Sequence, residues 1–215
     1  MMNLPRHDAI LLLGPTGAGK TPLGEALANS SRMSKSCFHF DFGANLRRIA
    51  GGKVSSGKFD IIDLKVIQEV LTQGKLLENE SFYIARKILE AFIVERSVAP
   101  QDVLILNGLP RHLGQAMDTD KLVSICAIVS LECTPSVVLA RIQQNTGGDR
   151  TNRTDDSLAE IQAKLQIFQE RTQPLRQYYE SKGVPVYQVN VGVNSTPVQM
   201  VDMVLMELNA LDGSG

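Results

Sequence analysis

The sequence has few cysteines, and the way they are spaced excludes two classes of protein. It contains three in 215 residues, Cys37, Cys126 and Cys133. Their odd number and lack of metal-ligand spacing argue against both a disulfide scaffold and a cysteine zinc site. All three lie in apolar stretches, so we expect buried, reduced thiols. This pattern favours a reducing compartment, and we predict a cytoplasmic protein.

The sequence also lacks long apolar runs and an excess of one charge. The apolar run nearest the N-terminus covers only residues 10–13, too short for a signal segment, and no stretch is long enough to span a membrane. The formal net charge is −1. We therefore expect neither a membrane nor a nucleic acid as the main partner. We also predict a monomer, although no sequence feature fixes the oligomeric state.

The remaining composition is that of one globular domain. Hydrophobic residues make up 43% and charged residues 21% of the chain. Short apolar runs alternate with longer helical patterns, which predicts an α/β fold with a doubly wound, five-stranded parallel sheet. The predicted strands cover residues 9–13, 37–41, 103–107, 122–131 and 184–191. One apolar face runs from Leu158 to Tyr179, and Pro174 is predicted to kink that helix.

We divide the predicted domain, residues 1–212, into a core and two excursions. About sixty mostly helical residues separate the second and third strands, more than a crossover helix needs. The core is predicted to comprise 1–41, 98–141 and 154–212. A helical insertion covers 42–97, and a short lid covers 142–153. Insertions of this kind tend to cover a site at the carboxyl edge of the sheet.

The sequence GPTGAGKT follows the first predicted strand and precedes a helical pattern. This is a phosphate-binding loop, in which backbone N–H groups and a helix N-terminus surround phosphate oxygens. Lys20 adds a positive charge for the β- and γ-phosphates, and the Thr21 hydroxyl is a ligand for Mg²⁺. The predicted ATP-binding residues here are Gly14, Pro15, Thr16, Gly17, Ala18, Gly19, Lys20 and Thr21.

Three further segments resemble the adenylate kinase and nucleoside monophosphate kinase family. LILNGLPRHLGQA (104–116) resembles its D-G-F-P-R-x-x-x-Q motif, and DFGANLRR (41–48) its S-T-G-D-x-L-R motif. DRTNRTDDSLAEIQAKLQIFQERTQPLRQYYESK (149–182) resembles its R-x-D-D lid segment and the following helix, which ends T-x-P-L-x-x-Y-Y. With the phosphate loop, four motifs in the family's order cover nearly the whole chain.

The resemblance implies a role for several residues. Arg47 and Arg111 would bind the phosphate of the acceptor, since a guanidinium group can hold phosphate oxygens bidentately. Gln115 would read the edge of the acceptor base. The implied acceptor-binding residues are Phe42, Gly43, Arg47, Gly108, Arg111 and Gln115.

The lid side would supply positive charge to the transferred group. The resemblance implies that Arg141 contacts ATP and that Arg150 and Arg153 act in catalysis with Lys20 and Arg111. Asp155 and Asp156 would form the lid hinge and orient the arginines. Other hinge candidates are Gly147 and Gly148.

The chain departs from the family at the metal site. Asn107 stands where the family has an aspartate that holds the water shell of the metal. Asp41, at the end of the second predicted strand, could compensate through water or could instead cap a helix. The predicted metal-site residues are therefore Thr21, Asn107 and Asp41, with Mg²⁺ bound together with ATP.

These patterns predict an ATP-dependent phosphotransferase. The expected acceptor is a nucleoside monophosphate, AMP first because of Gln115. Phe42 and Ala44 differ from the family motif, which leaves open a P-loop kinase of another small molecule. Asn107 leaves open a nucleotide-binding module with little turnover.

Overall fold

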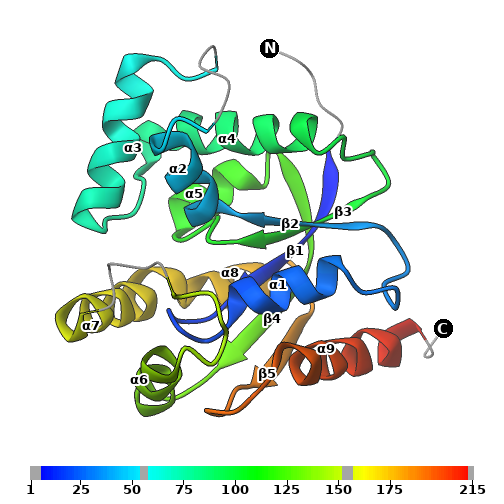
Figure 1. Ribbon diagram of the computed structural model, residues 1–215. Coiled ribbons are helices and arrows are strands. Elements are labelled where there is room, and N and C mark those ends of the chain that lie inside the picture. The colour runs from blue at the N-terminus through cyan, green and yellow to red at the C-terminus, as the bar shows by residue number, and fades with distance from the viewer. Residues whose placement is uncertain (1–5, 54–57, 152–156, 213–215) are drawn as a thin grey trace.

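The computed structural model describes residues 6–53, 58–151 and 157–212. In these residues five parallel strands form one sheet in the order β2-β3-β1-β4-β5 (Figure 1). The strands are β1 (His7–Leu13), β2 (Cys37–Asp41), β3 (Val103–Asn107), β4 (Val123–Glu132) and β5 (Val186–Asn190). The predicted fold class is confirmed. The predicted strand ends are displaced by one or two residues in β1, β4 and β5.

Alternating side chains of the sheet pack against two different helical layers. Leu11 and Leu13 share one buried cluster with side chains of α2 (Phe42–Ala50), α4 (Phe82–Glu95), α5 (Leu113–Thr119) and α8 (Pro174–Glu180). Ile10 and Leu12 share the other with α1 (Lys20–Ala28) and α9 (Pro197–Asp212). The two-residue period of a strand therefore explains why the strands are apolar throughout.

The residues between β2 and β3 form a helical group at one side of the sheet (Figure 1). It contains α2, α3 (Ile61–Gln73), the short 3-10 helix η1 (Asn79–Ser81) and α4. Ile84, Ile88 and Phe92 of α4 are at most 6% exposed and pack in the same cluster as the sheet. This group corresponds in position to the predicted insertion.

The predicted helix through Pro174 is interrupted before that residue. It consists of α7 (Leu158–Ile167), a π-helical turn η2 (Phe168–Thr172) and α8. The N–H of Gln173 donates to the carbonyl of Phe168 at 2.8 Å, five residues back. Proline has no N–H for the normal helical hydrogen bond, and the chain begins a new helix with Pro174 in its first turn. The interruption therefore takes the form of a wider turn.

The second excursion leaves the sheet after β4. Helix α6 (Pro135–Gln144) extends into the predicted lid, and Asn145 ends it in a left-handed conformation with φ 48°. No helix among the described residues is long and apolar enough to cross a bilayer.

Candidate active site

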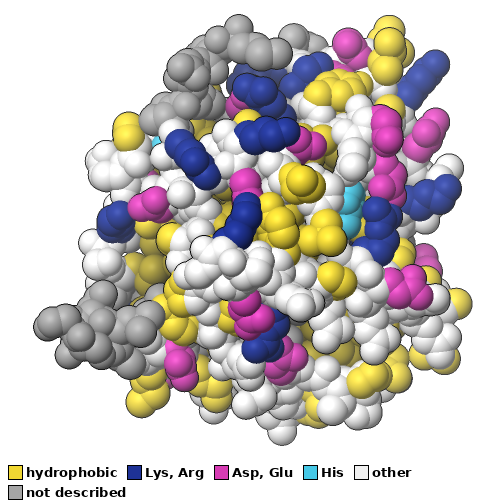
Figure 2. All heavy atoms as spheres, turned by 180° about the vertical axis from the view of Figure 1, so that it is seen from behind, with side chains coloured by type: hydrophobic (Ala, Val, Ile, Leu, Met, Phe, Trp, Pro, Cys, Tyr) yellow, Lys and Arg dark blue, Asp and Glu magenta, His cyan; other side chains and the backbone are white. Residues whose placement is uncertain are grey.

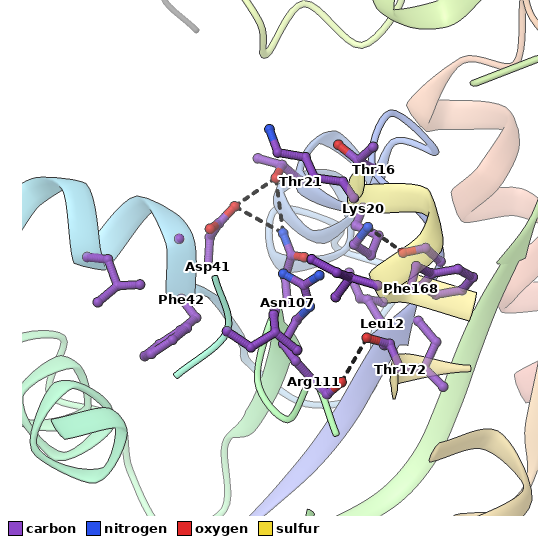
Figure 3. Close-up of a pocket in the computed structure, with 18 of the residues that line it drawn as sticks. Leu12, Thr16, Lys20, Thr21, Asp41, Phe42, Asn107, Arg111, Phe168 and Thr172 are labelled. Atoms are coloured by element: carbon purple, nitrogen blue, oxygen red, sulfur yellow. Dashed lines mark hydrogen bonds between the residues drawn. The ribbon is translucent and has the colours of Figure 1, made fainter. Parts of the chain in front are cut away.

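The phosphate loop lies between the carboxyl end of β1 and the first turn of α1, as the sequence predicts (Figure 3). Lys20 Nζ donates to the carbonyl oxygens of Gly14 at 2.6 Å and Pro15 at 2.8 Å. Gly17 has φ +77°, and a Cβ atom there would lie 2.7 Å from Ile142. The loop therefore requires glycine at this position for both its backbone conformation and its packing.

A cavity of about 220 Å³ opens beside this loop at the carboxyl edge of the sheet. It brings together most of the predicted site residues: Gly14, Thr16, Gly17, Gly19, Lys20, Thr21, Asp41, Phe42, Gly43, Arg47, Asn107, Gly108, Arg111, Gln115 and Arg150. Pro15, Ala18 and Arg141 are not among its lining residues. Arg153, Asp155 and Asp156 lie outside the described residues.

The cavity is strongly cationic. Its lining includes six basic side chains, those of Lys20, Arg47, Lys75, Arg111, Arg150 and Lys164, and two acidic ones, those of Asp41 and Asp149. On the face in Figure 2, by contrast, basic and acidic side chains are interspersed. The chain as a whole is nearly neutral, so the excess of positive charge is local to the cavity. Such a cavity favours a polyanionic ligand.

Thr21, Asp41 and Asn107 form a hydrogen-bonded triangle at the floor of the site (Figure 3). Thr21 Oγ1 donates to Asp41 Oδ2 at 2.7 Å. Asn107 Nδ2 lies 3.0 Å from each of these two oxygens. Asp41 and Asn107 are also register partners in adjacent strands. The single carboxylate of the triangle is therefore on β2, one strand away from the position implied by the family motif.

Asp41 has a second contact that the sequence also suggested. Its Oδ1 accepts the N–H of Ala44 at 2.8 Å and caps α2. Asp41 Oδ1 thus caps the helix that carries Arg47, and Asp41 Oδ2 accepts the hydroxyl of Thr21. The two interpretations of Asp41 are compatible because they use different oxygens.

Arg47 and Arg111 line the cavity, and neither has an ion-pair partner among the described residues. Burial lowers the pKa of Arg111. The Arg111 side chain is partly buried. Withdrawing a cation from water without an anionic partner is costly, and a bound anion would offset that cost. Gly108, at φ +82°, makes the turn between Asn107 and the segment leading to Arg111.

Gln115 lines the cavity but is already hydrogen-bonded within the protein. It is 1% exposed. Its Oε1 accepts the N–H of Arg111 and its Nε2 donates to the carbonyl of Leu77, both at 2.7 Å. A primary amide has two N–H groups and two lone pairs, so one of each is left for a ligand.

Arg141 is buried against the phosphate loop. Its Nε donates to the Gly17 carbonyl at 3.2 Å. Its Nη1 lies within 3.1 Å of three carbonyl oxygens, those of Gly192, Val193 and Ser195. In this structure Arg141 therefore holds the phosphate loop against the segment after β5. A direct contact of Arg141 with ATP stays a prediction.

The cavity is also lined by residues that were not identified as site residues from the sequence, among them Lys75, Asp149, Phe168 and Thr172. Lys75 and Asp149 belong to loops with no periodic pattern. Phe168 and Thr172 face the cavity from η2, and a π-helical turn has no clear sequence signal. Thr172 does lie in the T-x-P-L stretch, which carried the resemblance without a role for the threonine.

Comparisons with known proteins identify the family of the chain. Residues 10–163 match the AAA domain family model, which covers both the phosphate loop and the lid side. The chain belongs to this family. It is also similar to proteins named adenylate kinase: 28% identical to one from Parvibaculum lavamentivorans over 81% of this chain and 80% of that protein. One from Xanthomonas campestris is 29% identical over 81% of this chain and 86% of that protein. One from Thermus thermophilus is 26% identical over 82% of this chain and 86% of that protein.

The family assignment, the sheet order and the cationic cavity define the class of enzyme. The chain is an adenylate kinase-like nucleotide kinase, a phosphotransferase with a P-loop.

Proposed function

We propose that the protein transfers the γ-phosphoryl group of ATP, bound with Mg²⁺, to the phosphate of a nucleoside monophosphate, with AMP as the preferred acceptor. The observation that supports this most strongly is the pair of guanidinium groups of Arg47 and Arg111. They line the cavity of the phosphate loop and have no ion-pair partner among the described residues. Two such groups suit the phosphate of an acceptor, whose oxygens a guanidinium fork can bind bidentately.

A phosphate acceptor also requires little from the protein in proton transfer. The second pKa of a phosphate monoester is about 6, so the attacking oxygen is already ionised at neutral pH. The residues of the site need only place donor and acceptor in line and offset the charge of the transferred group. Lys20 acts from the donor side, and Arg111 and Arg150 act from the acceptor and lid sides.

The metal site is proposed from the chemistry of its side chains. Thr21 Oγ1 and Asp41 Oδ2 are oxygen donors, the type that Mg²⁺ prefers. Asn107 faces both of them with its amide nitrogen in this structure, so its carbonyl would reach the water shell of the ion after the amide turns over. Thr21 would bind the ion directly, with Asp41 and Asn107 holding its water molecules. The ion would screen the negative charge of the β- and γ-phosphates.

AMP is the first candidate because the similar proteins in three bacterial species are named adenylate kinase. Gln115 supports a nucleotide base in the cavity, since one N–H and one lone pair of its amide are available. The sequence predicts three buried thiols, but only Cys37 is buried, whereas Cys133 is half-buried and Cys126 is exposed. All three are free, which supports a reducing compartment such as the cytoplasm. We propose that the enzyme works as a monomer.

One observation favours a second candidate, a kinase of a hydroxylated small molecule. Asp41 presents a carboxylate to the cavity beside Thr21. A carboxylate could accept the proton of an attacking hydroxyl, which a phosphate acceptor does not need. Arg47 and Arg111, which pair with no acidic side chain in the described part of the chain, would then have to bind another anionic group of the acceptor.

The test is ADP formation from Mg-ATP with AMP, CMP, UMP, GMP, dTMP or no acceptor, with the product identified by mass. We expect acceptor-dependent turnover, fastest with AMP, and formation of a nucleoside diphosphate. Two adenosines joined by five phosphates should bind far more tightly than ATP, because they fill both halves of the site. A second panel of hydroxylated anions, such as hydroxy acids and sugar phosphates, tests the second candidate, and turnover with these alone would favour it. ATP binding without any ADP formation would indicate a binding module.

A further inference from the structure

The backbone of Arg111 is held by side chains on both sides of its peptide unit. Its N–H donates to Gln115 Oε1 at 2.7 Å, and its carbonyl accepts the hydroxyl of Thr172 at 2.8 Å. Figure 3 shows the Thr172 hydroxyl directed at the Arg111 carbonyl. The two partners come from elements far apart in the sequence, α5 and η2. Two such hydrogen bonds from side chains are unusual for a loop residue, whose backbone N–H and carbonyl groups more often bind water or other backbone groups.

The guanidinium of Arg111, in contrast, has no ion pair with a described residue that would fix its direction. Its position in the cavity therefore depends on where its backbone is held. The Thr172 contact is well protected, since Thr172 is only 4% exposed. A buried hydrogen bond of this kind restricts the backbone more than an exposed one.

The π-helical turn places Thr172 at this point. Gln173 N donates to Phe168 O, which widens the turn by one residue relative to an α-helix. Each residue after the turn is rotated about the helix axis compared with an uninterrupted helix. Phe168 and Thr172, at the two ends of η2, both reach the cavity. Such turns occur often at functional sites.

We propose that Thr172 is a positioning residue, which fixes the backbone of Arg111 and so aims its guanidinium group at the acceptor phosphate. This inference rests on the proposed function, because it requires Arg111 to bind that phosphate. Thr172 itself does not contact the reacting atoms. Gln115 supports the same backbone from the other side, in addition to its proposed contact with the base.

Thr172→Val tests the inference, because valine keeps the shape of threonine and removes the hydroxyl. We expect kcat to fall roughly tenfold, the order expected for one buried hydrogen bond, with KM for ATP unchanged. Thr172→Ser should restore most of the loss. If the valine variant does not fold, Thr172→Ala replaces it. Its kcat should then fall in the same way, and kcat of Thr172→Ser should again be close to that of the wild type.

The chain offers a matched control in Thr119. It is fully buried, and its hydroxyl has no hydrogen-bond partner among the described residues. Thr119→Val makes the same chemical change, and it should leave kcat and both KM values unchanged. Equal effects of the two valine variants, or wild-type kinetics for a folded Thr172→Val, would overturn the inference.

A double-mutant cycle with Arg111→Lys separates this inference from the proposed function. Lysine removes the planar guanidinium group, so a residue acting through that group loses its effect. Thr172→Val should then cost much less than tenfold in the Arg111→Lys background. Full additivity would show that Thr172 acts elsewhere and overturn the inference alone. Wild-type turnover of Arg111→Lys would instead contradict the role of Arg111 in the proposed function.

Discussion

The two sides of the cavity that we propose for the donor and for the acceptor, called the donor side and the acceptor side, are built in different ways. The donor side comes from eight consecutive residues, 14–21, whose backbone and single lysine form the phosphate loop. The acceptor side joins Arg47 of α2, Arg111 of the loop after β3, Leu77 of the insertion and Thr172 of η2. A local motif fixes the first, whereas hydrogen bonds between distant segments fix the second.

The largest expected effect lies on the donor side. Lys20→Met should lower kcat by a factor on the order of 10³, because the lost charge acts mainly in the transition state. The fold should be retained, because Lys20 is partly exposed on the cavity wall and methionine keeps the apolar stem of its side chain. Initial rates of ADP formation and thermal unfolding of the variant provide the two measurements. A folded Lys20→Met enzyme with wild-type turnover would refute the assignment of the donor side.

The second prediction concerns the triangle that joins the two sides. Asp41→Asn should lower Mg-dependent turnover about a hundredfold, because it removes the only carboxylate of the triangle. Asparagine caps helices as well as aspartate does, so the cap of α2 and the unfolding free energy should be little changed. This substitution therefore separates the two contacts of Asp41.

The substitution Asn107→Asp, which places a carboxylate on β3, completes the test of the metal role of Asp41. Asn107→Asp is expected to make Asp41→Asn much less damaging, since the two positions are register partners that share one site. The rates are measured for all four variants over a range of Mg²⁺ concentrations. If Asp41→Asn costs the same in both backgrounds, Asp41 has no part in holding the metal and is only a helix cap.

The same contrast explains how far the sequence predicts the structure. The phosphate loop could be placed from its own residues, and five apolar runs gave the strands, because each depends on neighbours in the chain. The hydrogen bond of Gln115 to the Arg111 backbone joins residues four apart in the sequence. That of Thr172 joins residues sixty-one apart and depends on a π-helical turn. The triangle was only partly predictable: Asp41 and Asn107 were singled out, but their contact requires the order of the strands.

The smallest expected effect concerns an ion pair on the acceptor side. Glu78, beside Leu77 of the insertion, pairs with both terminal nitrogens of Arg171 in η2. This hydrogen bonding lowers the pKa of Glu78 below its ordinary value of 4.5. The pair should therefore stabilise the fold above pH 4.5 and lose its contribution as the pH falls through the lower pKa of the folded state. Both side chains are more than a third exposed, which limits the contribution to about 0.5 kcal/mol.

Glu78→Gln should accordingly lower the unfolding free energy by about 0.5 kcal/mol near neutral pH and by nothing once Glu78 is protonated in both states. Urea unfolding at several pH values measures this difference. The control is Glu90→Gln, because Glu90 pairs with Arg86 within α4 and joins no separate segments. We expect Glu78→Gln to raise KM for the acceptor up to about twofold, with KM for ATP unchanged, and Glu90→Gln to change neither. If Glu78→Gln raised KM for the acceptor and KM for ATP equally, the ion pair of Glu78 and Arg171 would not act on the acceptor side alone.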